Sequence, residues 1–121
     1  MSFIKVLFSW LPIGQVPGIE AQELVLCLDK VQLVDVRTET EFASSHIAGA
    51  INLPITRFRQ ANIEALKLNK NLPVITICLS AHRSIPATRS LQSLGYDVRQ
   101  LNSGMRAWWK AELPCETGQP K

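Results

Sequence analysis

The sequence contains few cysteines and few histidines. Among 121 residues there are three cysteines, Cys27, Cys78 and Cys115, and two histidines. An odd number of widely spaced cysteines excludes a disulfide-stapled scaffold. The absence of a CxxC pair, with so few histidines, argues against a structural zinc site. We therefore expect no metal and no cofactor, at least one free thiol, and a reducing compartment such as the cytoplasm.

Charge and long apolar runs are also scarce. Charged residues make up 19% of the chain, below the average of about 25%. The net charge of +3, without a long basic run, does not predict nucleic-acid binding and is compatible with a small anionic substrate. No stretch reaches the ~18 apolar residues of a transmembrane helix. We expect residues 1–18 to form an apolar arm and linker that packs on the domain or on a second copy, with a peripheral membrane anchor or processed leader as the alternative.

The remaining chain has the length and the apolar content, 46%, of one globular domain. Hydrophobic patterns predict strands at residues 31–36, 50–53, 73–77 and 98–101, and helices at residues 20–28, 57–68, 84–94 and 104–110. Thr38 and Glu41 have capping-box spacing, which indicates a further short helix. This alternation predicts an α/β domain with a central, mostly parallel sheet flanked by helices.

The loop at residues 78–84 has the most chemically informative sequence, CLSAHRS. Cys78 ends a β-branched strand, Arg83 follows five residues later, and Ser84 opens a helix. Backbone N–H groups in such a loop can surround an anion, and they lower a thiol's pKa below about 8.5. We predict Cys78 as a nucleophile; the alternative is an inert buried cysteine. The predicted anion-binding residues are Leu79, Ser80, Ala81, His82, Arg83 and Ser84.

The other thiols and the tryptophans receive structural interpretations. Cys27 falls on the apolar pattern of the first predicted helix, so we expect it in the core. Cys115 is expected at the surface of the tail. Trp108 and Trp109 begin a short helix, where aromatic side chains usually pack into a core.

A series of short segments, including the loop at residues 78–84, stands in a characteristic order along the chain: residues 33–37 (LVDVR), 41–42 (EF), 46–54 (HIAGAINLP), 78–84 (CLSAHRS), 95–96 (GY), 104–108 (GMRAW) and 113–114 (LP). Together these segments resemble the rhodanese-like domain of single-domain sulfurtransferases. The resemblance covers residues 19–116, leaves residues 117–121 as a tail, and implies a three-layer rhodanese-like fold.

The resemblance implies that Cys78 accepts a sulfane sulfur from a small anionic donor such as thiosulfate, or from a persulfide. The resulting Cys78 persulfide then passes the sulfur to a thiol or to cyanide, and a protein could act as donor or acceptor. Asp35 and Arg37 resemble an ion pair that orients neighbouring loops. His46 resembles a histidine that forms hydrogen bonds within a loop.

The loop length separates the activities found on this fold. Phosphatases of this fold have a Cys-x5-Arg loop, whereas Cys78 and Arg83 form Cys-x4-Arg, which favours sulfur over phosphate. The alternatives are a non-catalytic binding or regulatory module and a cysteine-dependent phosphatase or arsenate reductase. Ala81, Ser103 and Glu112 stand where the family often has glycine. If the position of Ala81 requires a positive φ, its backbone is strained.

Overall fold

The computed structural model describes residues 14–119, so most of the expected N-terminal arm lies outside the described residues. In this part of the chain, parallel strands form a five-stranded sheet in the order β1-β5-β4-β2-β3. The strands are β1 (Gly18–Ile19), β2 (Gln32–Asp35), β3 (Ile51–Asn52), β4 (Val74–Ile77) and β5 (Val98–Leu101). The predicted parallel α/β fold is confirmed.

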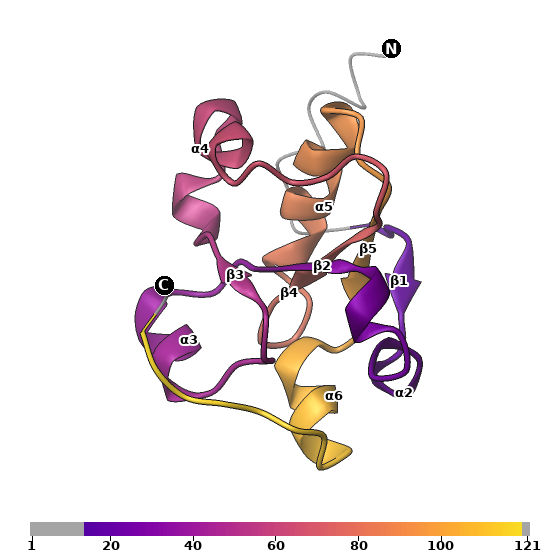
Figure 1. The fold of residues 1–121 in the computed structure, drawn as a ribbon, viewed down its shortest axis with the longest axis vertical. Helices are drawn as coiled ribbons and strands as arrows, with labels where there is room; N and C mark the ends of the chain where they lie inside the picture. The colour runs from indigo at the N-terminus through magenta and orange to yellow at the C-terminus, as the bar shows by residue number, and fades with distance from the viewer. Residues whose placement is uncertain (1–13, 120–121) are drawn as a thin grey trace.

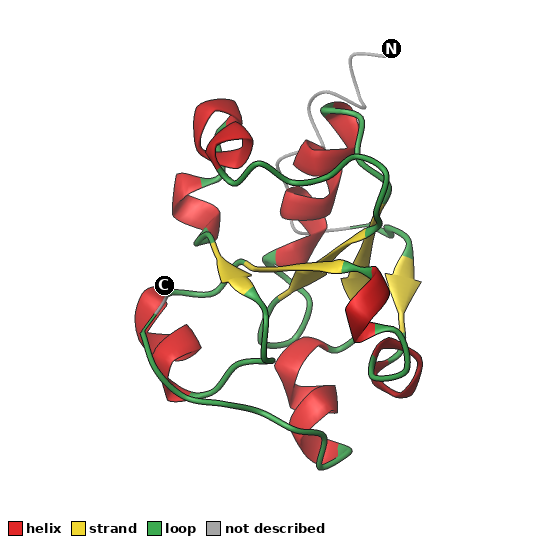
Figure 2. Ribbon diagram, viewed as in Figure 1, coloured by secondary structure: helices red, strands yellow, loops and turns green. Residues whose placement is uncertain are grey.

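Helices cover both faces of the sheet (Figures 1 and 2). They are α2 (Ala21–Leu24), α3 (Glu39–Ser44), α4 (Gln60–Ala65), α5 (Ser84–Ser93) and α6 (Gly104–Lys110), with short 3₁₀ helices η1 (Leu28–Lys30) and η2 (Ile55–Arg57). Helices α4 and α5 lie on one side, and α2, α3 and α6 lie on the other (Figure 1). Within the described residues, the longest helix has ten residues, and no helix has the length and apolar character to cross a membrane.

Side-chain alternation along the strands divides the core into two clusters. Ile75 and Ile77 of β4 join the cluster that includes Met105 and Trp108 of α6. Val74 and Cys78 join the opposite cluster, beside Ala87 and Leu91 of α5 and Ile63 of α4. Successive side chains of a strand point to opposite faces, so the residue that directly follows Ile77 faces α5. The Cys78 side chain therefore lies on the face of the sheet that α5 covers, and α5 is the helix that follows the loop at residues 78–84.

Local capping signals determine where α3 begins and where α5 ends. Thr38 Oγ1 accepts a hydrogen bond from the Glu41 backbone N–H at 3.2 Å, and Glu41 Oε1 accepts one from the Thr38 backbone N–H at 3.0 Å. The predicted capping box at the start of α3 is therefore present. Gly95, at φ 95°, lies just after α5, where a positive φ ends the helix.

The first helix is shorter than predicted, and Cys27 is less buried than predicted. The expected helix at residues 20–28 ends at Leu24, because the N–H groups of Leu26 and Cys27 bond three residues back, to Glu23 and Leu24, and tighten the chain into a turn. Cys27 lies in that turn and packs only partly buried against the core.

Trp108 is fully buried, as predicted, whereas Trp109 is 39% exposed. Trp109 is held at the surface by its indole N–H, which donates to Ser45 Oγ at 3.0 Å. Two further features differ from the prediction. The two-residue strand β1 was not predicted, and residues 57–68 form the shorter α4, preceded by η2.

Candidate functional site

The loop at residues 78–84, called the Cys78 loop below, lies at the carboxyl edge of the sheet between β4 and α5. Cys78 is 1% exposed. Its Sγ accepts the backbone N–H of Arg83 at 3.3 Å, and the backbone N–H of Ser80 also bonds to it. The loop therefore curls around the sulfur with its donors pointing inward.

The first turn of α6 supports the outer side of the Cys78 loop. The backbone N–H of Met105 donates to the Cys78 carbonyl oxygen at 2.8 Å, and that of Arg106 donates to the Leu79 carbonyl oxygen at 3.1 Å. A Cβ at Gly104 would collide with the same two carbonyl groups. Only glycine allows α6 to approach the loop this closely.

These contacts favour the thiolate form of Cys78. Burial raises the pKa of the thiol. The backbone N–H groups of Ser80 and Arg83 and the Arg83 guanidinium together lower the pKa by more than burial raises it, so the pKa lies below its ordinary value. Hydrogen bonds to the charged form and a nearby opposite charge both stabilise a thiolate. The side chain therefore has the electrostatic environment of a nucleophile.

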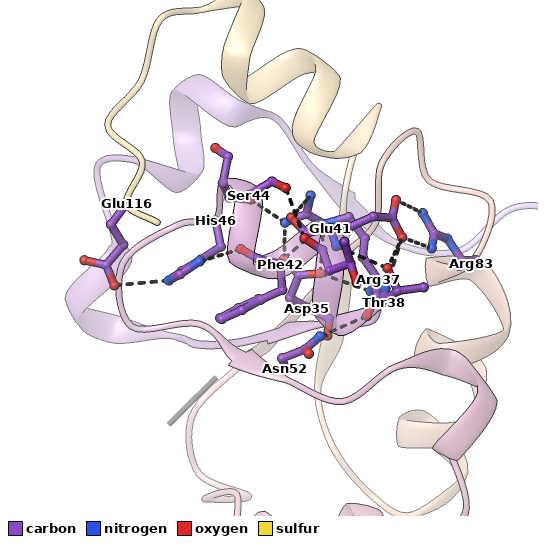
Figure 3. Close-up of polar contacts among 12 residues, drawn as sticks. Asp35, Arg37, Thr38, Glu41, Phe42, Ser44, His46, Asn52, Arg83 and Glu116 are labelled. Carbon is purple, nitrogen blue, oxygen red and sulfur yellow. Dashed lines mark hydrogen bonds and ion pairs between the residues drawn. The ribbon is translucent and has the colours of Figure 1, made fainter. Parts of the chain in front are cut away.

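The Arg83 guanidinium forms an ion pair with Glu41 of α3. Its two terminal nitrogens donate to the two Glu41 carboxylate oxygens at 2.6 and 2.9 Å, and Figure 3 shows the two side chains meeting between α3 and the loop. The pKa of Glu41 is lowered to about 2, mainly by the hydrogen bond from Arg83. Burial raises this pKa, and the hydrogen bonds from Thr38 lower it. Glu41 in turn raises the pKa of Arg83.

The other side chains of the loop hold its shape. The buried Ser84 hydroxyl lies 3.1 Å from the Ala81 carbonyl oxygen and 2.6 Å from Gln100 Oε1, which ties the loop to β5. Ser80 Oγ lies 3.1 Å from His82 Nδ1, and His82 is exposed. Ala81 has φ 78°, in the left-handed region that favours glycine. The strain foreseen at Ala81 is therefore present.

Asp35 and Arg37 form a buried ion pair at the end of β2. Arg37 Nη2 and Nε donate to the Asp35 carboxylate at 2.8 and 3.0 Å, and Nη2 also donates to the Ser45 carbonyl oxygen at 2.7 Å. The guanidinium lies 5.9 Å from the ring centre of Trp109. The pair therefore joins β2, the end of α3 and α6.

His46 is buried and links α3 to the C-terminal segment. Its Nδ1 lies 2.7 Å from the Phe42 carbonyl oxygen, and its Nε2 lies 3.2 Å from Glu116 Oε1 (Figure 3). The ring stacks on Phe42 at 3.8 Å. Backbone hydrogen bonds pair His46 with Glu116 in both directions. All of these contacts are made within the protein.

The family model for the rhodanese-like domain matches residues 20–111. The chain belongs to the rhodanese-like domain family. The model begins two residues after β1 starts and ends just beyond α6, so it includes the Cys78 loop, Glu41 and the ion pair of Asp35 and Arg37.

Solved rhodanese-like structures share this fold. A rhodanese-related protein of Thermoplasma volcanium superposes with a TM-score of 0.75 at 26% identity, covering 84% of this chain and 98% of that one. A thiosulfate sulfurtransferase of Pseudomonas aeruginosa gives a TM-score of 0.76 at 27% identity, covering 86% of this chain and 20% of that one. The match to one fifth of the larger protein shows that this chain corresponds to one unit within it.

A curated relative in sequence is an HTH-type transcriptional regulator of Mycobacterium tuberculosis, which is 34% identical over 93 residues, or 75% of this chain and 40% of the regulator. This chain likewise spans 47% and 61% of two further relatives. Rhodanese-like domains of this kind therefore occur within longer proteins.

The three positions where the family often has glycine share one backbone conformation. Ala81, Ser103 and Glu112 have φ values of 78°, 58° and 56°. The rhodanese-like fold keeps the turn at each place although the residue has a Cβ, at a cost of about 1–2 kcal/mol for each left-handed residue.

Two residues of the site were not foreseen from the sequence. Glu41 was placed in the capping box and in a segment that resembles the family, and Gly104 at the start of a helix and in another such segment, but neither was assigned to the Cys78 loop. A signal for Glu41 does exist: it lies in the first turn of the helix that follows β2, and β2 neighbours β4 in the sheet. The carboxyl ends of neighbouring parallel strands meet at one edge, so an acidic residue there is available to a loop arginine.

Proposed function

We propose that this rhodanese-like domain is a sulfurtransferase that carries sulfur as a persulfide on Cys78. The observation that carries the proposal is the Cys78 sulfur held by the inward N–H groups of Ser80 and Arg83, with a lowered thiol pKa. The structural similarity to a thiosulfate sulfurtransferase supports the same chemistry.

The reaction has two half-steps. The Cys78 thiolate attacks the outer sulfur of a donor such as thiosulfate, the donor's S–S bond breaks, and sulfite leaves with the bonding pair. The persulfide anion on Cys78 is stabilised by the same N–H groups that hold the thiolate. An acceptor, cyanide or a thiol, then attacks the outer sulfur, and the Cys78 thiolate is restored.

The geometry gives less support to a phosphatase. The Cys78 loop has four residues between Cys78 and Arg83, and both terminal nitrogens of Arg83 bind Glu41. A phosphate in this loop would lack the two-pronged arginine contact that suits its oxygens. A binding module would need neither the lowered thiol pKa nor the N–H groups around the sulfur.

We propose partners of matching chemistry. The donor is a small sulfane-sulfur anion such as thiosulfate or a protein persulfide, and the acceptor is cyanide or a thiol, including a protein thiol. A reducing cytoplasm would keep Cys78 available for the reaction.

Intact-mass measurement after incubation with thiosulfate tests the proposal. We expect the wild-type chain to gain the mass of one sulfur atom, which cyanide then removes as thiocyanate. Cys78→Ala should gain nothing, whereas the double variant Cys27→Ser with Cys115→Ser should gain the sulfur as the wild type does. No adduct on the wild type with thiosulfate or other sulfane donors, or Cys78-dependent phosphatase turnover in its place, would overturn the proposal.

A further inference from the structure

The Cys78 loop contains a second polar pair at its exposed rim. His82 Nδ1 lies 3.1 Å from Ser80 Oγ, and the backbone N–H of Ser80 bonds to the Cys78 sulfur. The residue that follows His82, Arg83, contributes the other N–H to the same sulfur. The imidazole is thus anchored to one of the two residues that hold the sulfur and directly precedes the other in the chain, while His82 remains exposed to an incoming molecule.

The other ring nitrogen of His82 is available for chemistry. Among residues 14–119, the structure shows one hydrogen bond to the His82 ring, the Nδ1 contact with Ser80. Because Nδ1 is engaged, the acid–base function falls to Nε2. An imidazole held by one nitrogen presents the other in a fixed direction.

Transfer of sulfur to a thiol requires a proton acceptor. The thiolate is the nucleophile, and a free thiol with a pKa of about 8.5 is mostly protonated at neutral pH. Arg83 cannot accept a proton. Glu41 is a weak base, since its pKa is about 2, and Cys78 itself carries the sulfur. Of the side chains in the Cys78 loop or bonded to it, His82 is the one suited to remove the proton.

We propose that His82 is a catalytic base for thiol acceptors, an inference that rests on the sulfurtransferase function proposed above. Nε2 takes the proton of the acceptor thiol, and the thiolate attacks the outer sulfur of the Cys78 persulfide. The S–S bond to Cys78 breaks, and its electron pair returns to Sγ, where the N–H groups of Ser80 and Arg83 receive it. The proton passes from His82 to the transferred sulfur. One thiol and one persulfide anion thus give one persulfide product and the Cys78 thiolate.

The proposal names a substrate class. Weakly acidic alkyl thiols need the base, whereas an aromatic thiol that is already ionised at the assay pH does not. The two acceptors differ in the step that His82 would assist and share the later attack on sulfur. Their comparison on one variant therefore separates proton removal from any role of His82 in holding anions or shaping the loop.

The experiment measures single-turnover sulfur transfer from preloaded Cys78 persulfide, with both acceptors compared at one pH and the alkyl thiol also followed over a pH series. The variant His82→Asn keeps a polar group near Ser80 but cannot exchange a proton. We expect a loss of about 100-fold with the alkyl thiol, at the lower end for general base catalysis, and less than about 3-fold with the ionised aromatic thiol. Ser80→Ala, which frees the imidazole, should give a smaller loss in the same direction. The His82→Asn rate with the alkyl thiol should rise with pH as that thiol ionises.

Persulfide loading by intact mass is measured first, so that the two proposals fail separately. A wild type that takes up no sulfur overturns the sulfurtransferase function. If His82→Asn loads sulfur but loses rate equally with both acceptors, or loses none with the alkyl thiol, His82 is not the base. If His82→Asn and a second variant, His82→Gln, both fail to load sulfur, His82 serves the donor step and the proposal is likewise overturned.

Discussion

Replacing Glu41 with glutamine tests the ion pair that ties the Cys78 loop to α3. In Glu41→Gln the side chain keeps its size, and glutamine also completes a capping box with a threonine. The change therefore removes the charge opposite Arg83 while leaving the start of α3 intact. We expect the variant to fold and to be less stable than the wild type at neutral pH.

The size of the effect follows from the pKa of Glu41. The carboxyl has a pKa of about 2 in the folded chain instead of 4.5, and each tenfold change in proton affinity is worth about 1.4 kcal/mol. The upper bound on the stabilisation is therefore about 3–4 kcal/mol. The two side chains are 31% and 30% exposed, so solvent screening reduces the expected loss to about 1–2 kcal/mol.

The lowered pKa also determines the pH dependence. A carboxyl with a lowered pKa in the folded state stabilises the protein above its unfolded pKa, and this contribution is lost as the pH falls toward the folded pKa. The stability difference between wild type and Glu41→Gln should therefore be complete at neutral pH. It should shrink as the pH falls from 4.5 toward about 2.

The measurement is the free energy of unfolding by urea for both proteins at pH 7 and at acidic pH. Glu39→Gln is the matched control, because Glu39 lies in the same first turn of α3 and pairs with Arg57 at 2.9 Å. That pair is 50% and 60% exposed, so its loss should cost less than about 0.5 kcal/mol. Equal losses in the two variants, or a Glu41→Gln difference that is unchanged at low pH, would refute the reasoning.

Two further predictions concern backbone positions around Cys78. Ala81→Gly should raise the free energy of unfolding by up to about 1 kcal/mol. Glycine removes the strain of the left-handed φ in the folded state, and this gain exceeds the cost of its greater entropy in the unfolded chain. A marked loss of stability in urea would contradict this. Gly104→Ala should cost about 1–3 kcal/mol more than Gly49→Ala, because both glycines have a positive φ but only the Cβ at position 104 meets the carbonyls of Cys78 and Leu79. Gly104→Ala should also slow persulfide formation, and equal behaviour of the two variants would show that the close approach is unimportant.

Much of the fold could be predicted because its signals are local. The β-branched run of β4 and the capping box of α3 each depend on residues within a few positions. The failures occur where tertiary contacts determine the outcome. Strand β1 is two residues long and exists through its pairing with β5. Helix α2 has an apolar helical pattern, yet the chain tightens after Leu24. Trp109 lies at the surface because adjacent positions of a helix face different directions, and its indole N–H donates to Ser45 Oγ instead.

The site likewise has a part that local sequence predicts and a part that depends on long-range contacts. Cys78 and Arg83 lie five residues apart, so their joint loop could be recognised from spacing alone. The partner of Arg83 is 42 residues away in the sequence, and it meets the loop only because β2 and β4 are neighbours in the sheet. Arg83 was therefore predicted as a free anion-binding cation, whereas in the structure its charge is shared with Glu41.

A local signal and a long-range contact depend on the same atom. Glu41 Oε1 accepts hydrogen bonds from the backbone N–H and the hydroxyl of Thr38, at 3.0 Å each, and from Arg83 at 2.6 Å. From the sequence, the capping box is the one physical role assigned to this glutamate, and the contact with Arg83 is not expected. In the folded chain, the cap fixes the carboxylate, and the carboxylate fixes the guanidinium that closes the loop around Cys78. The position of Arg83 beside the sulfur thus depends on how α3 begins.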